Sequence, residues 1–72
     1  MEIIGYYKRE RDGNEYILYK TESGNKLTIG VCEWDATDDK MAELKKVKKI
    51  NTEKIRKELK KFYPFHPLLD VL

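Results

Sequence analysis

The amino-acid sequence predicts a single α+β domain, with a three-stranded antiparallel meander, two short helices packed on one face of it and an apolar C-terminal tail. The first half is rich in Ile, Tyr, Val and Thr and contains two glycine turn signals. The second half has apolar residues at helical spacings. Because 72 residues supply only one small core, we assign the sheet to residues 1–35, the helical half to 36–63 and the tail to 64–72.

Two turn signals divide the first half into three expected strands, near residues 2–10, 15–22 and 26–34. The signals are Asp-Gly at 12–13 and Gly-Asn at 24–25, which suit two-residue hairpin loops because these residues tolerate positive φ. Loops this short make neighbouring strands antiparallel.

If both loops have two residues, side-chain alternation sorts the three strands into two faces. The face expected to be the core carries Ile3, Tyr7, Tyr16, Leu18, Leu27, Ile29 and Val31. The opposite face carries Ile4, Tyr6, Ile17, Tyr19, Cys32 and Trp34. The second face is too aromatic for an ordinary wet surface, so the tail or another molecule should cover it.

Thr37 should cap the first helix, since a threonine side chain can accept a hydrogen bond from the first helical turn. The apolar residues that follow at intervals of three are Met41, Leu44, Val47 and Ile50. At this spacing the apolar stripe rotates around a straight helix, so the helix should lose regularity near residues 47–50. A short strand there is the alternative.

The second helix should begin after Asn51, which can serve as its cap. Its apolar side chains, at spacings of four and three, are Ile55, Leu59 and Phe62. Pro64 disfavours helical geometry in the residue before it and should end the helix there. The tail beyond should cover a sheet face, or else insert into a partner's groove, because its two prolines lower the cost of ordering it.

Residues 44–61 form the clearest electrostatic feature, with nine basic and two acidic side chains and hence a net charge of +7. Such a segment could contact nucleic-acid phosphates, which require charge and little geometry. The candidate contacts are Lys45, Lys46, Lys48, Lys49, Arg56, Lys57, Lys60 and Lys61. A solvated helix face is the alternative interpretation, and the single arginine in the segment argues against base-specific contacts.

Tyr6, Tyr19 and Trp34 are the candidate partner-binding residues, because Tyr and Trp are favoured at the centres of interfaces. We expect a small non-enzymatic protein-interaction module, a regulator or inhibitor that acts by surface docking or homodimerisation. The alternative is a nucleic-acid-binding module that contacts phosphates through Lys45 to Lys61. The overall charge of only +2 favours the protein partner.

The sequence offers little for catalysis or metal binding. Cys32 and His66 are the only residues of their kinds, and a cysteine nucleophile needs a base and an orienting group beside it. The carboxylates near the first helix lack the spacing of a calcium loop. They are Asp35, Asp38, Asp39 and Glu43. We expect no enzymatic activity, metal ion, cofactor or small-molecule substrate.

With one cysteine the chain cannot form an internal disulfide, which favours a reducing, cytoplasmic setting. No segment approaches the ~18 apolar residues of a membrane-spanning helix. Residues 1–6 lack the basic and apolar pattern of a signal peptide. The sequence therefore predicts a cytoplasmic protein without a membrane span.

Overall fold

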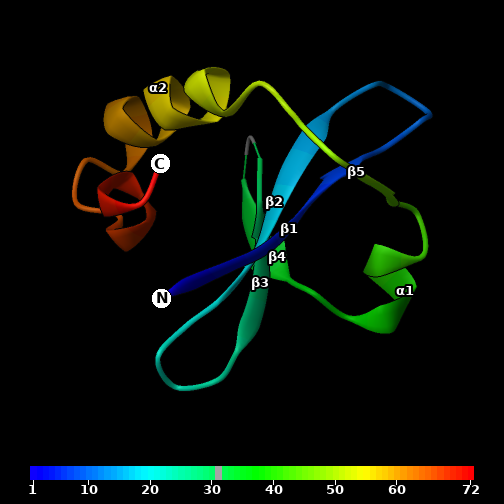
Figure 1. Cartoon of the computed structure of the whole chain (residues 1–72), viewed down its shortest axis with the longest axis horizontal. Coiled ribbons are helices and arrows are strands. Elements are labelled where there is room, and N and C mark those ends of the chain that lie inside the picture. Colours follow the sequence, from blue (N-terminus) through cyan, green and yellow to red (C-terminus); the bar gives the residue numbers. More distant parts are fainter. Residues whose placement is uncertain (31) are drawn as a thin grey trace.

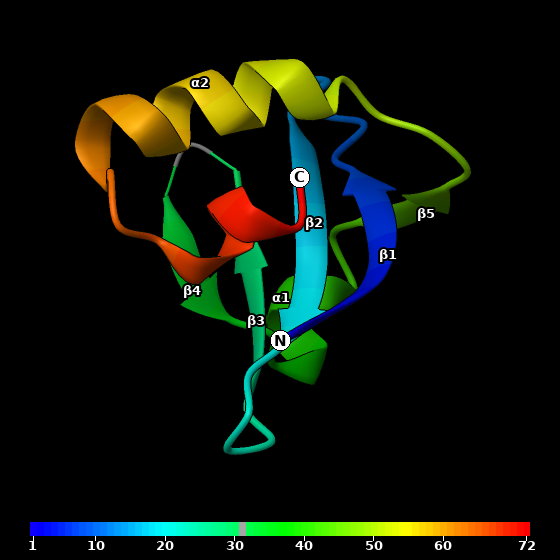
Figure 2. The same cartoon turned by 60° about the vertical axis from the view of Figure 1, so that its left-hand side comes forward.

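The computed structural model describes residues 1–30 and 32–72 and confirms an α+β fold. In chain order its elements are β1 (Glu2–Lys8), β2 (Glu15–Lys20), β3 (Lys26–Ile29), β4 (Glu33–Asp35), α1 (Asp38–Met41), β5 (Lys45–Val47), α2 (Thr52–Phe62) and the 3₁₀ helix η1 (Pro67–Asp70). A twisted sheet lies between α2 with η1 on one side and α1 on the other (Figures 1 and 2). No helix in the described residues is long and apolar enough to cross a membrane.

The sheet has five strands in the order β4-β3-β2-β1-β5, and all neighbours are antiparallel. The predicted three-stranded meander is therefore only its centre. The single strand expected over 26–34 is instead two strands, β3 and β4, and between them the Gly30 amide donates to the Cys32 carbonyl (3.2 Å). The predicted position of Val31 lies outside the described residues.

The first helix is much shorter than the sequence predicts. Thr37 does cap α1, accepting a hydrogen bond from the Lys40 amide, but the helix ends at Met41. Residues 45–47 then pair with β1 as strand β5. Apolar residues three apart cannot all face one sheet from a single helix. A strand in this position instead supplies hydrogen-bond partners to the backbone groups at the free edge of β1.

The second helix matches its prediction. Asn51 caps α2, because its side chain accepts a hydrogen bond from the Lys54 amide (3.3 Å). The Asn51 amide in turn donates to the Glu15 carboxylate (3.2 Å) at the start of β2. The helix start is thus attached to the sheet, and α2 then places Ile55 and Leu59 on the core.

Both hairpin loops are longer than the two residues predicted, which changes the register. In the first loop the Arg9 amide donates to the Asn14 carbonyl, and Gly13 takes a positive φ of 72°. Tyr6 therefore lies opposite Ile17 rather than Tyr19. In the second hairpin Ile17 lies opposite Ile29, a shift of an odd number of residues from the predicted pairing. An odd shift moves every side chain of a strand to the other face.

As a consequence, the main core lies on the face that carries Ile17 and Tyr19, not on the one predicted. Its buried members are Ile17, Tyr19, Ile29, Ile50, Ile55, Leu59 and Leu68. The tail contributes Leu68, which is 0% exposed, so the tail covers this sheet face together with α2. The prediction that both helices pack on one face is wrong, since α1 lies on the other side (Figure 2).

The opposite face holds a second, smaller set of buried side chains on the central strands, namely Tyr16, Leu18 and Thr28. The Tyr16 ring packs edge-on to Trp34, with 5.7 Å between the ring centres. Gly30 lies against the Tyr16 ring, because a Cβ on Gly30 would be 2.7 Å from that ring. Only glycine fits this close approach.

Candidate functional site

The three predicted partner-binding residues do not share one exposed face. Tyr19 is in the core and only 1% exposed, and Tyr6 is half-buried against the same core. Trp34 lies opposite Thr28 on the other face of the sheet. The expected aromatic face is wrong because the longer second loop inverts β3, and β4 with it, relative to β2.

Tyr19, Glu33 and His66 form a polar cluster that holds the tail to β4. Nε2 of His66 lies 2.6 Å from the Glu33 carboxylate and 3.5 Å from the Tyr19 hydroxyl. Burial, followed by the nearby Glu33 carboxylate, raises the pKa of Tyr19. Nδ1 of His66 accepts a hydrogen bond from the Leu68 amide (3.1 Å), which assigns the ring proton to Nε2 and makes Nε2 the donor to Glu33.

His66 therefore has a structural role that its sequence context did not reveal. Both of its ring nitrogens are occupied, and within the described residues neither is hydrogen-bonded to Cys32, which is exposed. The two residues thus do not form a nucleophile and base pair in this arrangement. No group of three or more His, Cys, Asp or Glu side chains over 1–30 and 32–72 could hold a metal ion.

The most exposed apolar feature is a segment between α2 and η1, which we call the aromatic turn and define as Phe62, Tyr63, Pro64 and Phe65. Phe65 is 96% exposed, Phe62 56% and Tyr63 50%. A shallow hollow of about 260 Å³ lies against Tyr63, Pro64 and Phe65. The expectation that Phe62 packs on the sheet is wrong, because its side chain, at the last position of α2, is 56% exposed.

The aromatic turn is held at both ends. The Tyr63 amide donates to the Leu59 carbonyl (2.7 Å), and the His66 amide donates to the Tyr63 carbonyl (2.9 Å), which closes a four-residue turn. Leu59 before the turn and Leu68 after it are both in the core. Pro64 within the turn limits its backbone freedom further. The turn thus presents Phe65 to solvent from a backbone that is hydrogen-bonded on both sides of it.

Basic side chains lie beside the aromatic turn on α2. Lys57, Lys60 and Lys61 are exposed, and Nζ of Lys61 lies 5.2 Å from the centre of the Phe62 ring. Other lysines of the predicted basic segment lie elsewhere, with Lys45 and Lys46 on β5 and Lys48 and Lys49 in the connection that follows. Arg56 is half-buried and paired with Glu53 (3.4 Å). The segment therefore does not form one continuous helical strip.

Sequence reasoning missed the aromatic turn as the main exposed feature, although the two prolines around Phe65 and His66 were a usable signal. A proline on each side limits how far an apolar side chain can turn back to the core. Comparisons with protein-family models, with curated proteins and with solved structures find no match for this chain.

Proposed function

We propose that this protein is a non-enzymatic protein-interaction module that docks through the aromatic turn. The observation that carries the proposal is the 96% exposure of Phe65 on a turn fastened at both ends. A chain this small has little apolar area for its core, so it normally buries its aromatic rings. Large exposed aromatic side chains are typical anchors at interface centres.

Energetic considerations favour Phe65 as the anchor. Burying a phenylalanine side chain contributes about 1.5–3 kcal/mol relative to leaving it in water. The hydrogen bonds on either side of the turn already fix its backbone, so binding does not have to order the segment. Binding through the turn therefore avoids the cost of ordering this segment.

The lysines beside the turn indicate the chemistry of the partner. Lys60 and Lys61 directly precede the turn in the chain, and Nζ of Lys61 lies 5.2 Å from the Phe62 ring, so basic side chains adjoin the surface that Phe65 would dock with. An apolar pocket with an acidic rim is complementary to this arrangement, and opposite charges at a rim raise the association rate. We therefore assign the turn to a protein partner with an acidic surface around an apolar pocket.

A second copy of this chain fits less well. The exposed parts of the three aromatic rings amount to roughly 400 Å², from about 150–250 Å² for each fully exposed ring. A stable interface takes about 800 Å² from each partner, so any partner, a second copy included, must also contact residues around the turn. A symmetric dimer through the turn would also bring the lysines of one copy toward those of the other, which is repulsive.

The test compares three purified, immobilised proteins: the wild type, Phe65→Ala and the control Ile4→Ala, which removes an exposed apolar side chain from β1 instead. Proteins that the wild type retains from lysate, prepared with and without nuclease, are purified and titrated against all three. We expect Phe65→Ala to weaken binding by about 10- to 100-fold and Ile4→Ala to leave it unchanged.

The proposal is wrong if every purified binder has equal affinity for wild type and Phe65→Ala. Binding that disappears with nuclease would instead favour the nucleic-acid alternative, with the α2 lysines as phosphate contacts. Sedimentation of the wild type provides the check on self-association. A dimer that dissociates on Phe65→Ala substitution would identify a second copy as the occupant and contradict the acidic partner.

A further inference from the structure

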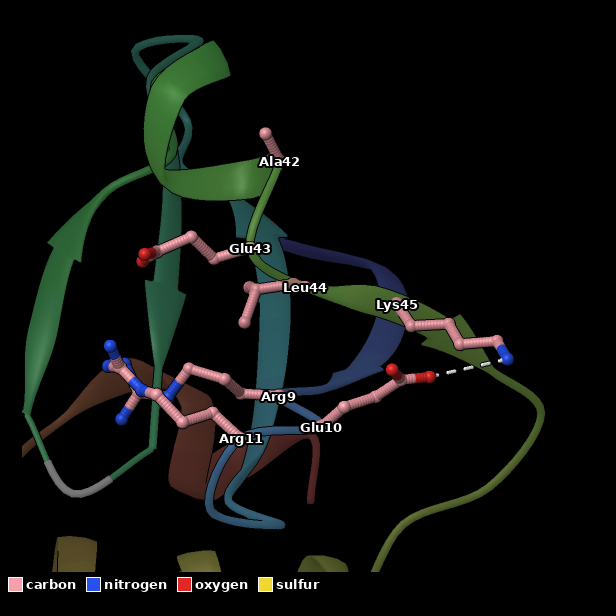
Figure 3. A pocket seen from close by; sticks show the side chains of 7 residues that line it. All are labelled: Arg9, Glu10, Arg11, Ala42, Glu43, Leu44 and Lys45. Carbon is pink, nitrogen blue, oxygen red and sulfur yellow. Dashed lines mark ion pairs between the residues drawn. The ribbon is translucent and has the colours of Figure 1, made fainter.

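A groove lies on the side of the sheet away from α2, between the β1–β2 loop and residues 42–45 (Figure 3). Its first hollow has a volume of about 430 Å³ and includes Arg9, Arg11 and Leu44 in its walls. A second hollow of about 290 Å³ shares Arg9 and Leu44 with the first and adds Trp34. The shared side chains make the two hollows neighbours, with a basic end, an apolar middle and an aromatic end.

The β1–β2 loop holds the basic end in place. Arg9 donates from Nε (2.9 Å) and Nη2 (2.6 Å) to the same oxygen of Asp12, and the other Asp12 oxygen accepts from the Asn14 amide (3.0 Å). The Arg9 guanidinium also lies 5.5 Å from the centre of the Tyr16 ring. These contacts order Arg9 before any ligand arrives, which reduces the cost of binding.

Charge in the groove is only partly balanced. Asp12 neutralises Arg9, and Glu10 pairs with Lys45 (3.5 Å) at the far end. Arg9 and Arg11 both line the first hollow, and Figure 3 shows their guanidinium groups extending to the same side of the picture as the Glu43 carboxylate. Arg11 has no ion-pair partner among the residues that the structure describes. The guanidinium group of an arginine is a fork of N–H donors, and the fork of Arg11 suits the oxygens of a phosphate.

The aromatic end offers a flat surface for a ring. Nζ of Lys40 lies 5.5 Å from the centre of the Trp34 ring, over one face of the indole, and both residues line the second hollow. Tryptophan faces stack on nucleobases without requiring a particular base. Lys40 is long and flexible, so it can move from the ring to a negatively charged ligand.

We propose that this groove binds a nucleotide, with the phosphate on Arg11 and on the donors of Arg9 that Asp12 leaves free, the base on Trp34 and the sugar over Leu44. Glu43 would accept hydrogen bonds from sugar hydroxyl or base amino groups, since a carboxylate is an acceptor for such donors. The two hollows together have the volume of ordinary small-molecule sites. The nucleotide comes either as a free mononucleotide or as one unit of a single strand. This site is independent of the aromatic turn.

Trp34 is the only tryptophan of the chain, so its fluorescence reports on this groove directly. The probes are adenosine monophosphate, a short oligodeoxyadenylate and inorganic phosphate, each titrated at low salt. We expect saturable quenching by a nucleotide probe and its reversal by excess inorganic phosphate. Arg11→Gln should weaken binding about tenfold, because one charged hydrogen-bonding group is lost. Quenching by the oligonucleotide alone would assign the site to a strand, and quenching by both would assign it to the mononucleotide.

Lys20→Gln is the matched control, since it removes the same charge from an exposed position at the opposite end of β2. It should bind both nucleotide probes like the wild type. The proposal is overturned if neither nucleotide probe quenches saturably, or if Arg11→Gln and Lys20→Gln weaken binding equally. Equal weakening would mean that only the overall charge of the protein attracts the probe.

Discussion

Leu68→Ala is the substitution that tests most sharply whether the tail belongs to the core. Leu68 is 0% exposed and packs in the cluster formed with α2 and the sheet. Truncating a buried leucine to alanine removes about 2–5 kcal/mol of stability. Leu68 sits on a single 3₁₀ turn that can shift to fill part of the cavity, so we expect the lower half of that range, about 2–3 kcal/mol.

Urea unfolding followed by circular dichroism measures this effect. For a small domain with a slope near 1 kcal/mol/M, the unfolding midpoint should fall by about 2 M or more. A domain of this size has a stability of roughly 3–5 kcal/mol, so Leu68→Ala should leave a substantial unfolded fraction at 25 °C. Leu68→Met, which conserves volume, should remain folded with a loss below about 1.5 kcal/mol.

Phe65→Ala supplies the comparison from the same segment of the chain. Phe65 is almost fully exposed, so its removal should change the stability by no more than about 0.5 kcal/mol. If Phe65→Ala destabilises the protein as much as Leu68→Ala does, the aromatic turn is packed on the protein rather than presented to solvent. If Leu68→Ala has no effect, the tail does not cover the sheet.

Three further substitutions test the sheet and its attachments. Gly30→Ala should destabilise by about 1–3 kcal/mol in urea unfolding because its Cβ would overlap the Tyr16 ring, and an unchanged midpoint would contradict that contact. Asn51→Ala should cost about 1 kcal/mol by removing the α2 cap, and Asn51→Gly much less, whereas equal losses would argue against capping. The hydrogen bond from Arg9 lowers the pKa of Asp12 to about 2. The small contribution of this pair to stability is therefore present above pH 3.8 and is lost as the pH falls toward about 2. An NMR titration should show Arg9→Gln moving the Asp12 midpoint up toward 3.8, and no movement would contradict the pairing.

Local signals in the sequence predicted the elements that depend on local physics. The central strands, the Thr37 and Asn51 caps and the end of α2 near Pro64 all follow from turn, capping and backbone preferences of the residues present. A short strand near residues 47–50 was only the alternative to a helix, and the position of β5 at Lys45–Val47 could not be predicted in this way. Its residues pair with β1, far away along the chain, and its short basic sequence does not alternate.

The register depended on loop lengths that the dipeptides alone did not determine. A glycine at a positive φ fits hairpin loops of more than one length, so the Asp-Gly signal located the first turn without fixing its size. One odd shift in the second loop then exchanged the faces of Leu27 and Ile29. That single error placed Trp34 on the face of Tyr6 and Tyr19, whereas the exposed aromatic side chains among the described residues lie in the aromatic turn.

The central claim is that a fixed backbone presents an exposed Phe65, and ¹⁵N relaxation of the Phe65 amide tests it most directly. Hydrogen bonds on both sides and the buried Leu59 and Leu68 predict an order parameter near 0.85, as in rigid backbone. A value below about 0.6 would mean that the segment is flexible. The turn would then not be ordered before binding, and the account of Phe65 as a preformed anchor would be wrong.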